Sequence, residues 1–158
     1  FPEVEYLYVD TEENRLIAQA LQEQWSTVLN VEVAVRGVTE DELRQLLLDG
    51  AYTCAGFAIS SSWDDAAAFL SRWVTGKVGN LVKVSSEKYD LLLEIATTTF
   101  DTAAREAYLH DAEDILLQSC GVVPLFYYGR AHLLADGLKN LVGRSSGVYF
   151  LQWLEENL

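Results

Sequence analysis

The stretch that decides the fold is TAAREAYLHDAEDILLQSCGVVPLFYYGR, residues Thr102–Arg130. Its first part has apolar and small residues at helical spacing, which predicts a helix of about five turns. These residues are Ala104, Tyr108, Ala112, Ile115, Leu116 and Ser119. Asp101 or Thr102 is placed to cap the start of this helix, and Gly121 to end it. The run Val122–Tyr128 is apolar throughout and rich in β-branched and aromatic residues, which predicts a buried strand inside a sheet.

The rest of the chain alternates strand and helix patterns. Strands are predicted at residues 3–9, 31–35 and 51–59. Helices are predicted to begin after capping residues, which are Asp10, Thr39, Asp64 or Asp65, and Ser86. Asn30 and Gly50 are placed to end the first two helices. This alternation predicts an α/β fold, a mixed sheet flanked by helices, in one domain spanning residues 1–158.

Composition narrows the function. The formal net charge of −13 argues against nucleic acid and anionic membranes as partners, because both attract clustered Lys and Arg. No apolar run approaches the ~20 residues that span a bilayer. The chain contains no Met and opens Phe1-Pro2-Glu3, which indicates a processed product or a fragment. Cys54 and Cys120 are predicted to be buried small hydrophobic residues rather than a disulfide.

The best candidate site on physical grounds is Ser60–Asp65, because ligands collect at the carboxyl ends of strands in α/β sheets. Two interpretations of the three serines stay open: a turn with a helix cap, or a hydrogen-bonding loop over a ligand. Trp63 either shields the core or forms an aromatic wall of a cleft. For Asp64 and Asp65 the default role is capping, since negative charge is favourable at a helix start.

Signatures of enzymes and metal sites are absent from the sequence. There is no phosphate-binding glycine loop, paired-cysteine motif or nucleophile elbow. His110, Asp111 and Glu113 point to different sides of a helix, so a solvated face is expected rather than a metal site. His132 is expected to be a core or edge residue. We therefore expect no catalytic residue, no metal and no cofactor.

Several segments together carry a resemblance to a known family. They are AGFAISSSWDDAAAFLSRW at residues 55–73, Ser86–Asp90, Arg105, Tyr108, Ala112-Glu113, Ile115-Leu116, Val123–Tyr128 and Gly137-Leu138. Their order resembles the carboxy-terminal lobe of the family 5 extracytoplasmic solute-binding proteins, the oligopeptide- and dipeptide-binding components of ABC importers. The likeness covers nearly the whole chain.

The resemblance implies one lobe of a periplasmic-binding-protein-like (type II) fold that closes by a hinge on a solute, usually a peptide. It implies an amino-terminal lobe and an ABC permease as partners. It implies an extracytoplasmic location, as a cell-surface lipoprotein or a periplasmic protein, and no enzymatic activity. The ligand-binding residues it suggests are Ile59, Ser60, Ser61, Ser62, Trp63, Asp64, Tyr127 and Tyr128.

One departure from the family bears on the solute. Family peptide binders commonly have Gly-Trp-x-x-Asp-Tyr after the third strand, and its aspartate holds the peptide's α-amino group. In this chain Ile59 stands at the position of the family's tryptophan, Ser62 at that of the aspartate and Trp63 at that of the tyrosine. Serine carries no charge, so the ion pair between the family's aspartate and the peptide's α-ammonium cannot form at Ser62. Asp64 is a candidate to replace that aspartate. Nickel chelates, haem and sugars, which other members bind, stay open beside peptides.

Two other functions stay open from the sequence. One is a small α/β enzyme using the Ser60–Ser62 loop, and the other is a sensor or interaction domain derived from the lobe. A lobe without its partner also exposes apolar hinge residues, so self-association is expected.

Overall fold

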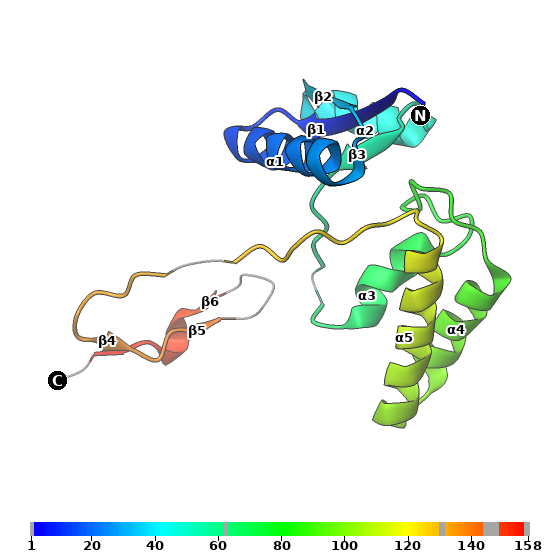
Figure 1. The fold of residues 1–158 in the computed structure, drawn as a ribbon. Helices are drawn as coiled ribbons and strands as arrows, with labels where there is room; N and C mark the ends of the chain where they lie inside the picture. Colours follow the sequence, from blue (N-terminus) through cyan, green and yellow to red (C-terminus); the bar gives the residue numbers. More distant parts are fainter. Residues whose placement is uncertain (1, 62, 130–131, 144–148, 157–158) are drawn as a thin grey trace. The chain divides into compact units, whose positions relative to one another are not determined.

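The computed structural model describes residues 2–61, 63–129, 132–143 and 149–156. The chain forms two compact units (Figure 1): the first unit is Phe1–Ile59 with Val78–Lys83, and the second unit is Ser60–Lys77 with Val84–Leu158. The first is a sheet with helices and the second begins with a helical cluster, so the predicted α/β class is confirmed. The single domain predicted over residues 1–158 stays a prediction.

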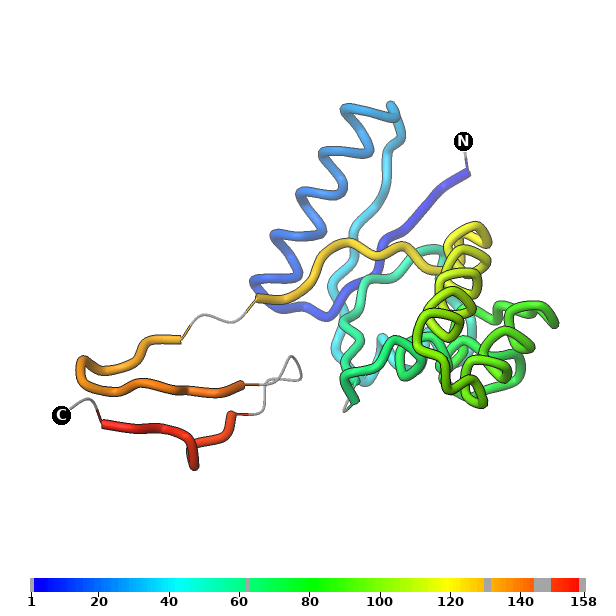
Figure 2. Tube along the Cα trace, turned by 90° about the horizontal axis from the view of Figure 1, so that it is seen from below, coloured from blue at the N-terminus to red at the C-terminus, as the bar shows by residue number. Residues whose placement is uncertain are grey.

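The first unit is built on a three-stranded parallel sheet. Its strands are β1 (Val4–Val9), β2 (Val33–Val38) and β3 (Cys54–Gly56), in the order β2-β1-β3. Helix α1 (Glu12–Leu29) connects β1 to β2, and α2 (Glu40–Asp49) connects β2 to β3. Figure 2 follows the chain from β1 through α1 and back into β2. These are the βαβ units that the alternating pattern predicts.

Both faces of this sheet are covered by apolar packing. Tyr6 and Tyr8 of β1 pack with Ala18 and Trp25 of α1. The alternate residue Leu7 packs on the other side with the α2 leucines, Leu43 and Leu47. Successive side chains of a strand point to opposite faces, which is why neighbouring residues of β1 join different cores.

Helix ends in the first unit follow the predicted chemistry with one correction. Thr39 caps α2 by accepting a hydrogen bond from the Glu42 backbone N–H, and Gly50 ends α2 with φ +69°. Asn30 likewise ends α1 in the left-handed region. The cap of α1, however, is Thr11 and not the predicted Asp10. The Asp10 carboxylate instead pairs with Arg15, at 2.7 Å.

The third strand is shorter than predicted. The apolar run of residues 51–59 contributes only Cys54–Gly56 to the sheet, and these residues pair with β1 alone. An apolar run supplies burial, but the length of a strand is set by the backbone partners available to it. Ser60–Asp65 therefore do not follow directly from a strand end.

The second unit begins with helices packed around a buried tyrosine. Its helices are α3 (Ala66–Leu70), which continues as the 3₁₀ turn η1 (Ser71–Trp73), then α4 (Glu87–Thr98) and α5 (Thr102–Gln118). As predicted, Asp65, Ser86 and Asp101 cap the three α-helices. Tyr89 of α4 is fully buried, and its hydroxyl donates to the Leu70 carbonyl at 2.6 Å.

The predicted continuation of α5 into a buried strand is wrong. The helix ends at Gln118, and the left-handed residue after it is Cys120 rather than Gly121. Residues 122–128 form no strand, and Val123, Leu125 and Phe126 are at least half exposed. In the described part of the chain no backbone pairs with this segment, and an unpaired segment is not a strand however apolar it is.

The last part of the chain forms two short antiparallel ribbons. Strand β4 (Leu138–Lys139) pairs with β7 (Glu155–Glu156), and β5 (Val142–Gly143) pairs with β6 (Tyr149–Phe150). The 3₁₀ turn η2 (Leu151–Trp153) lies between β6 and β7. Residues 132–135 form no strand. Among the described helices, none has the length and apolar character needed to cross a membrane.

Candidate functional site

A cavity of about 460 Å³ lies in the second unit beside α3. Three consecutive residues before the helix line it: Trp63, Asp64 and Asp65. Its other lining residues are Ala67, Ala68, Ser71 and Thr97. The short alanine side chains of α3 leave the space, and most of the exposed lining is apolar. The hollow is largely open to solvent, and its volume falls in the roughly 300–1,000 Å³ range of small-molecule sites.

Asp65 is held in place by two elements. Its Oδ1 accepts a hydrogen bond from the Ala67 backbone N–H at 2.8 Å, which caps α3. Arg105 Nη2 of α5 donates to both carboxylate oxygens, at 2.9 and 2.8 Å. The hydrogen bond from the Arg105 guanidinium lowers the pKa of Asp65 below its usual value, against the opposing effect of burial. Asp65 is therefore a carboxylate whose charge is balanced by Arg105, and it has a structural role at the edge of the cavity.

The loop residues suggested by the sequence divide into two groups. Trp63 and Asp64 line the cavity, and Trp63 is 75% exposed. Ser61 makes a local turn, because its Oγ accepts from the Trp63 backbone N–H at 3.1 Å. Ile59 and Ser60 are not among the described residues that line the cavity. Ser62, the position of the family's aspartate, lies outside the described residues.

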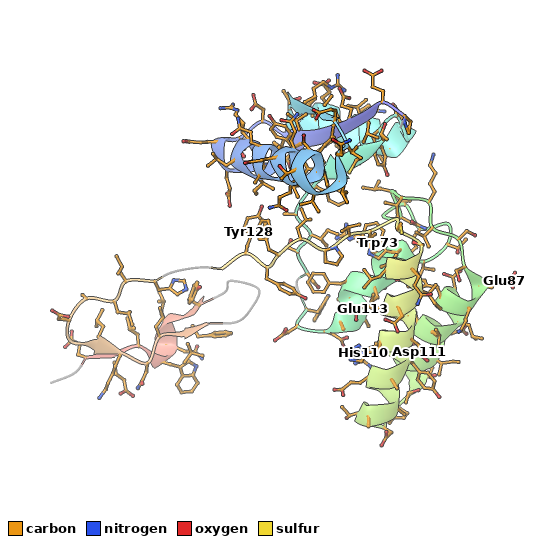
Figure 3. All side chains as sticks on the ribbon, in the orientation of Figure 1. Trp73, Glu87, His110, Asp111, Glu113 and Tyr128 are labelled. Carbon is orange, nitrogen blue, oxygen red and sulfur yellow. The ribbon has the colours of Figure 1, made fainter. Side chains whose placement is uncertain are left out.

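The two suggested tyrosines do not lie with Trp63 and Asp64. Tyr127 is 101% exposed and Tyr128 is 55% exposed, and neither is among the described residues that line the cavity. The Tyr128 ring, labelled in Figure 3, contacts Phe126 edge to face, with ring centroids 5.0 Å apart. Their role in binding stays a prediction.

Four of the seven described residues that line the cavity are not among those predicted from the sequence: Ala67, Ala68, Ser71 and Thr97. Ala67 and Ala68 carry a weak signal, since adjacent small residues on an amphipathic helix leave room at its surface. Thr97 has none, because it lies at the far end of α4 and meets the loop only through tertiary packing. Arg105 was part of the family resemblance, but its pairing with Asp65, 40 positions away, is not readable from spacing.

The acidic and histidine cluster on α5 shows no metal-binding arrangement. His110 Nδ1 lies 3.4 Å from Glu113 Oε2, and both side chains are exposed. Figure 3 shows these two side chains and Asp111 along the helix. The solvated face agrees with expectation for these residues. Among the described residues no group of three or more His, Cys, Asp or Glu is arranged to hold a metal ion.

The two cysteines differ from each other. Both are free thiols. Cys54 in β3 is partly buried, and burial raises the pKa of its thiol. Cys120 is exposed, so the prediction that both cysteines are buried is wrong for Cys120, which follows the end of α5 and has no core to enter.

Comparisons with known proteins identify the homologues of this chain. The dipeptide-binding protein DppE of Bacillus subtilis is 26% identical over 159 residues, covering 99% of this chain and 29% of DppE. The periplasmic murein peptide-binding protein MppA of Escherichia coli is 26% identical over 137 residues, covering 84% of this chain and 25% of MppA. No protein-family profile matches the chain.

Solved structures show the same fold. An unliganded open form of MppA matches with a TM-score of 0.88, and another structure, of Escherichia coli MppA, with 0.82. Each is 21% identical to this chain, and each match covers 98% of this chain and 30% of the MppA chain. The fold is thus that of one part of a periplasmic-binding-protein-like structure.

Fold and relatives together define the class: the homologues of this chain are extracytoplasmic solute-binding proteins of family 5. The resemblance predicted from the sequence is confirmed. The chain spans less than a third of the length of these relatives, consistent with a single lobe.

Proposed function

We propose that this chain is the carboxy-terminal lobe of a two-lobed solute-binding protein that delivers peptides to an ABC importer. The observation that carries the proposal is the match to DppE, a dipeptide-binding protein, along 99% of the chain. A lobe is half of a binding site, because a ligand held between two lobes is buried from both sides. The remaining lobe and the permease are the partners this proposal requires.

Binding would proceed by hinge closure. Residues 59–64 would contribute cleft contacts from this lobe, and two of them, Trp63 and Asp64, line a cavity in the structure. Tyr127 and Tyr128 are exposed and available to a ligand or to the other lobe. Closing the lobes would bring a second set of contacts onto the solute and present both lobes to the permease.

The proposal includes the absence of catalysis and an extracytoplasmic location, periplasmic or as a lipoprotein. The curated relatives reported above are named as binding proteins, and MppA is named as periplasmic. No observation in the described residues favours the alternative of an enzyme that uses the serine loop. Neither Ser60 nor Ser61 has a histidine as a hydrogen-bond partner among the described residues.

Thermal unfolding of the full-length, two-lobed protein with and without a mixed peptide pool tests the proposal. Ligand at 100 times its dissociation constant adds about 2.7 kcal/mol to stability, which raises the midpoint by a few degrees. The control is the same pool after complete hydrolysis to amino acids. We expect a rise with the peptides alone.

Two results would contradict the proposal. An intact fold with no rise means that the solute is not a peptide. Cleavage of the pool during the measurement, seen by mass spectrometry and lost when Ser60 and Ser61 are changed to alanine, means that the chain belongs to an enzyme.

A further inference from the structure

Among the described residues that line the cavity beside α3, one carboxylate has no oppositely charged partner. Asp65 is paired with Arg105 and capped onto α3. Asp64 makes no hydrogen bond or ion pair with any described residue, although it lines the same cavity. The described lining residues include no Lys, Arg or His that could pair with an anionic ligand. The cavity is therefore suited to a cationic ligand.

The lining hydroxyls agree with this polarity. The Ser71 Oγ donates to the Ala68 carbonyl at 3.4 Å, and the Thr97 Oγ1 donates to the Glu94 carbonyl at 2.7 Å. With their protons committed, both oxygens are left as acceptors. Among the described lining side chains, the Trp63 indole N–H is the one donor not already committed within the chain, so most of the polar side-chain groups around the cavity can accept hydrogen bonds from a ligand. A ligand that donates several hydrogen bonds fits it.

The apolar part of the lining specifies the rest of the ligand. Ala67 and Ala68 offer methyl groups, and Trp63 offers a largely exposed indole. Alkyl stems pack on such surfaces while their charged ends stay at polar groups. An indole face also attracts an ammonium directly. A bare ammonium would leave most of the cavity of about 460 Å³ unfilled.

We propose that this cavity binds a long basic side chain of the solute, with Asp64 holding its ammonium and Trp63 packing on its stem. The inference rests on the proposed function, and it names peptides with a lysine-like side chain as the preferred class. Water screens an exposed carboxylate, so the pair becomes strong only when a closed cleft excludes solvent.

The test measures binding of tripeptides to the full-length protein by calorimetry. Each of three peptides has one lysine among alanines, at a different position, and three matched peptides have norleucine instead. Norleucine keeps the stem and removes the charge, while the α-amine is free in every peptide. We expect the best lysine peptide to bind roughly tenfold more tightly than its norleucine match.

Asp64→Asn should reduce that ratio to about two or less, since the amide keeps the shape and loses the charge. Trp63→Leu should weaken the lysine peptide by roughly two- to tenfold. The control Asp114→Asn changes an exposed carboxylate of α5 that does not line the cavity, and should leave the ratio unchanged.

Each contrary outcome has its own meaning. Equal binding of lysine and norleucine peptides overturns the inference and leaves the peptide-binding function standing. An equal loss for both kinds of peptide in Asp64→Asn overturns it too, because Asp64 then acts on the α-amine or on the fold. If no tripeptide binds and the mixed pool gives no stabilisation, the proposed function fails and this inference fails with it.

Discussion

Arg105 of α5 donates through Nη2 to both carboxylate oxygens of Asp65, the residue that caps α3, at 2.9 and 2.8 Å. One side chain thereby joins two helices and fixes the residue next to Asp64. The Arg105 and Asp65 side chains are 30% and 40% exposed, so solvent screens the pair. Its importance lies in orienting the loop as much as in stability.

We predict that Asp65→Asn destabilises the second unit by about 0.5–1 kcal/mol, the upper range for an exposed pair. Asparagine caps a helix as well as aspartate does, so the change removes the ion pair and keeps the cap. Urea unfolding followed by circular dichroism measures the loss. A double-mutant cycle with Arg105→Gln isolates the pair, and additive effects of the two changes would contradict a direct interaction.

The same pair gives a pH dependence. The pKa of Asp65 is lowered in the folded chain. The stabilisation is therefore complete above the ordinary Asp pKa of about 3.9, and it is lost as pH falls through the lowered folded value. We expect the stability difference between wild type and Asp65→Asn to be constant from pH 7 to pH 5 and to shrink in acid. A difference that grows in acid would contradict this assignment.

Another prediction concerns the buried hydroxyl of Tyr89. Removing it in Tyr89→Phe leaves the Leu70 carbonyl without its 2.6 Å hydrogen bond in a buried setting. The expected cost is about 1–3 kcal/mol in urea unfolding. Tyr127→Phe is the matched control, because Tyr127 is fully exposed and its change should stay within about 0.5 kcal/mol. Equal effects of the two substitutions would show that the buried bond contributes nothing.

Tyr89 also predicts alkaline behaviour. Burial raises the pKa of its phenol above the ordinary value of 10.0. The unfolded chain then ionises first, so the stability contributed by the neutral phenol is present below pH 10 and falls as pH rises above it. The advantage of wild type over Tyr89→Phe should therefore shrink between pH 10 and pH 11 in urea titrations. A constant advantage across that range would contradict this reading.

Local signals in the sequence predicted much of this fold. Thr39, Ser86 and Asp101 cap the starts of α2, α4 and α5 as expected. Asn30 and Gly50 end α1 and α2. These residues act within one turn of themselves, so their roles depend little on the rest of the chain. The α/β class follows from the alternation of strand and helix patterns along the chain.

What the sequence did not predict depends on distant partners. Residues 122–128 have the composition of a buried strand, yet nothing in the described chain pairs with them. The cavity joins Trp63 to Thr97 through helix packing, which no spacing rule gives. Composition reports what a segment can bury; only the tertiary structure decides what meets it.

The two thiols should differ in reactivity. Alkylation at pH 7 needs the thiolate, and burial both shields Cys54 and raises the pKa of its thiol. We expect iodoacetamide to modify the exposed Cys120 well before Cys54, as measured by peptide mass spectrometry over time. In guanidinium the two rates should converge. Equal rates in the native chain would mean that the first unit opens readily around β3.

The last prediction is that the isolated 158-residue chain self-associates. Val123, Leu125 and Phe126 are at least half exposed, and with Tyr127 and Tyr128 they form a run of exposed apolar and aromatic side chains. Exposed apolar surfaces of this kind favour association, because contact between molecules removes apolar area from water. Light scattering across a concentration series should show growth above the monomer mass, reduced by Leu125→Ser with Phe126→Ser. The control Leu16→Ser removes an equally exposed apolar residue on α1 and should change little. Strictly monomeric behaviour at high concentration would show that this run is no docking surface, which would also weaken the case that it lies against a second lobe.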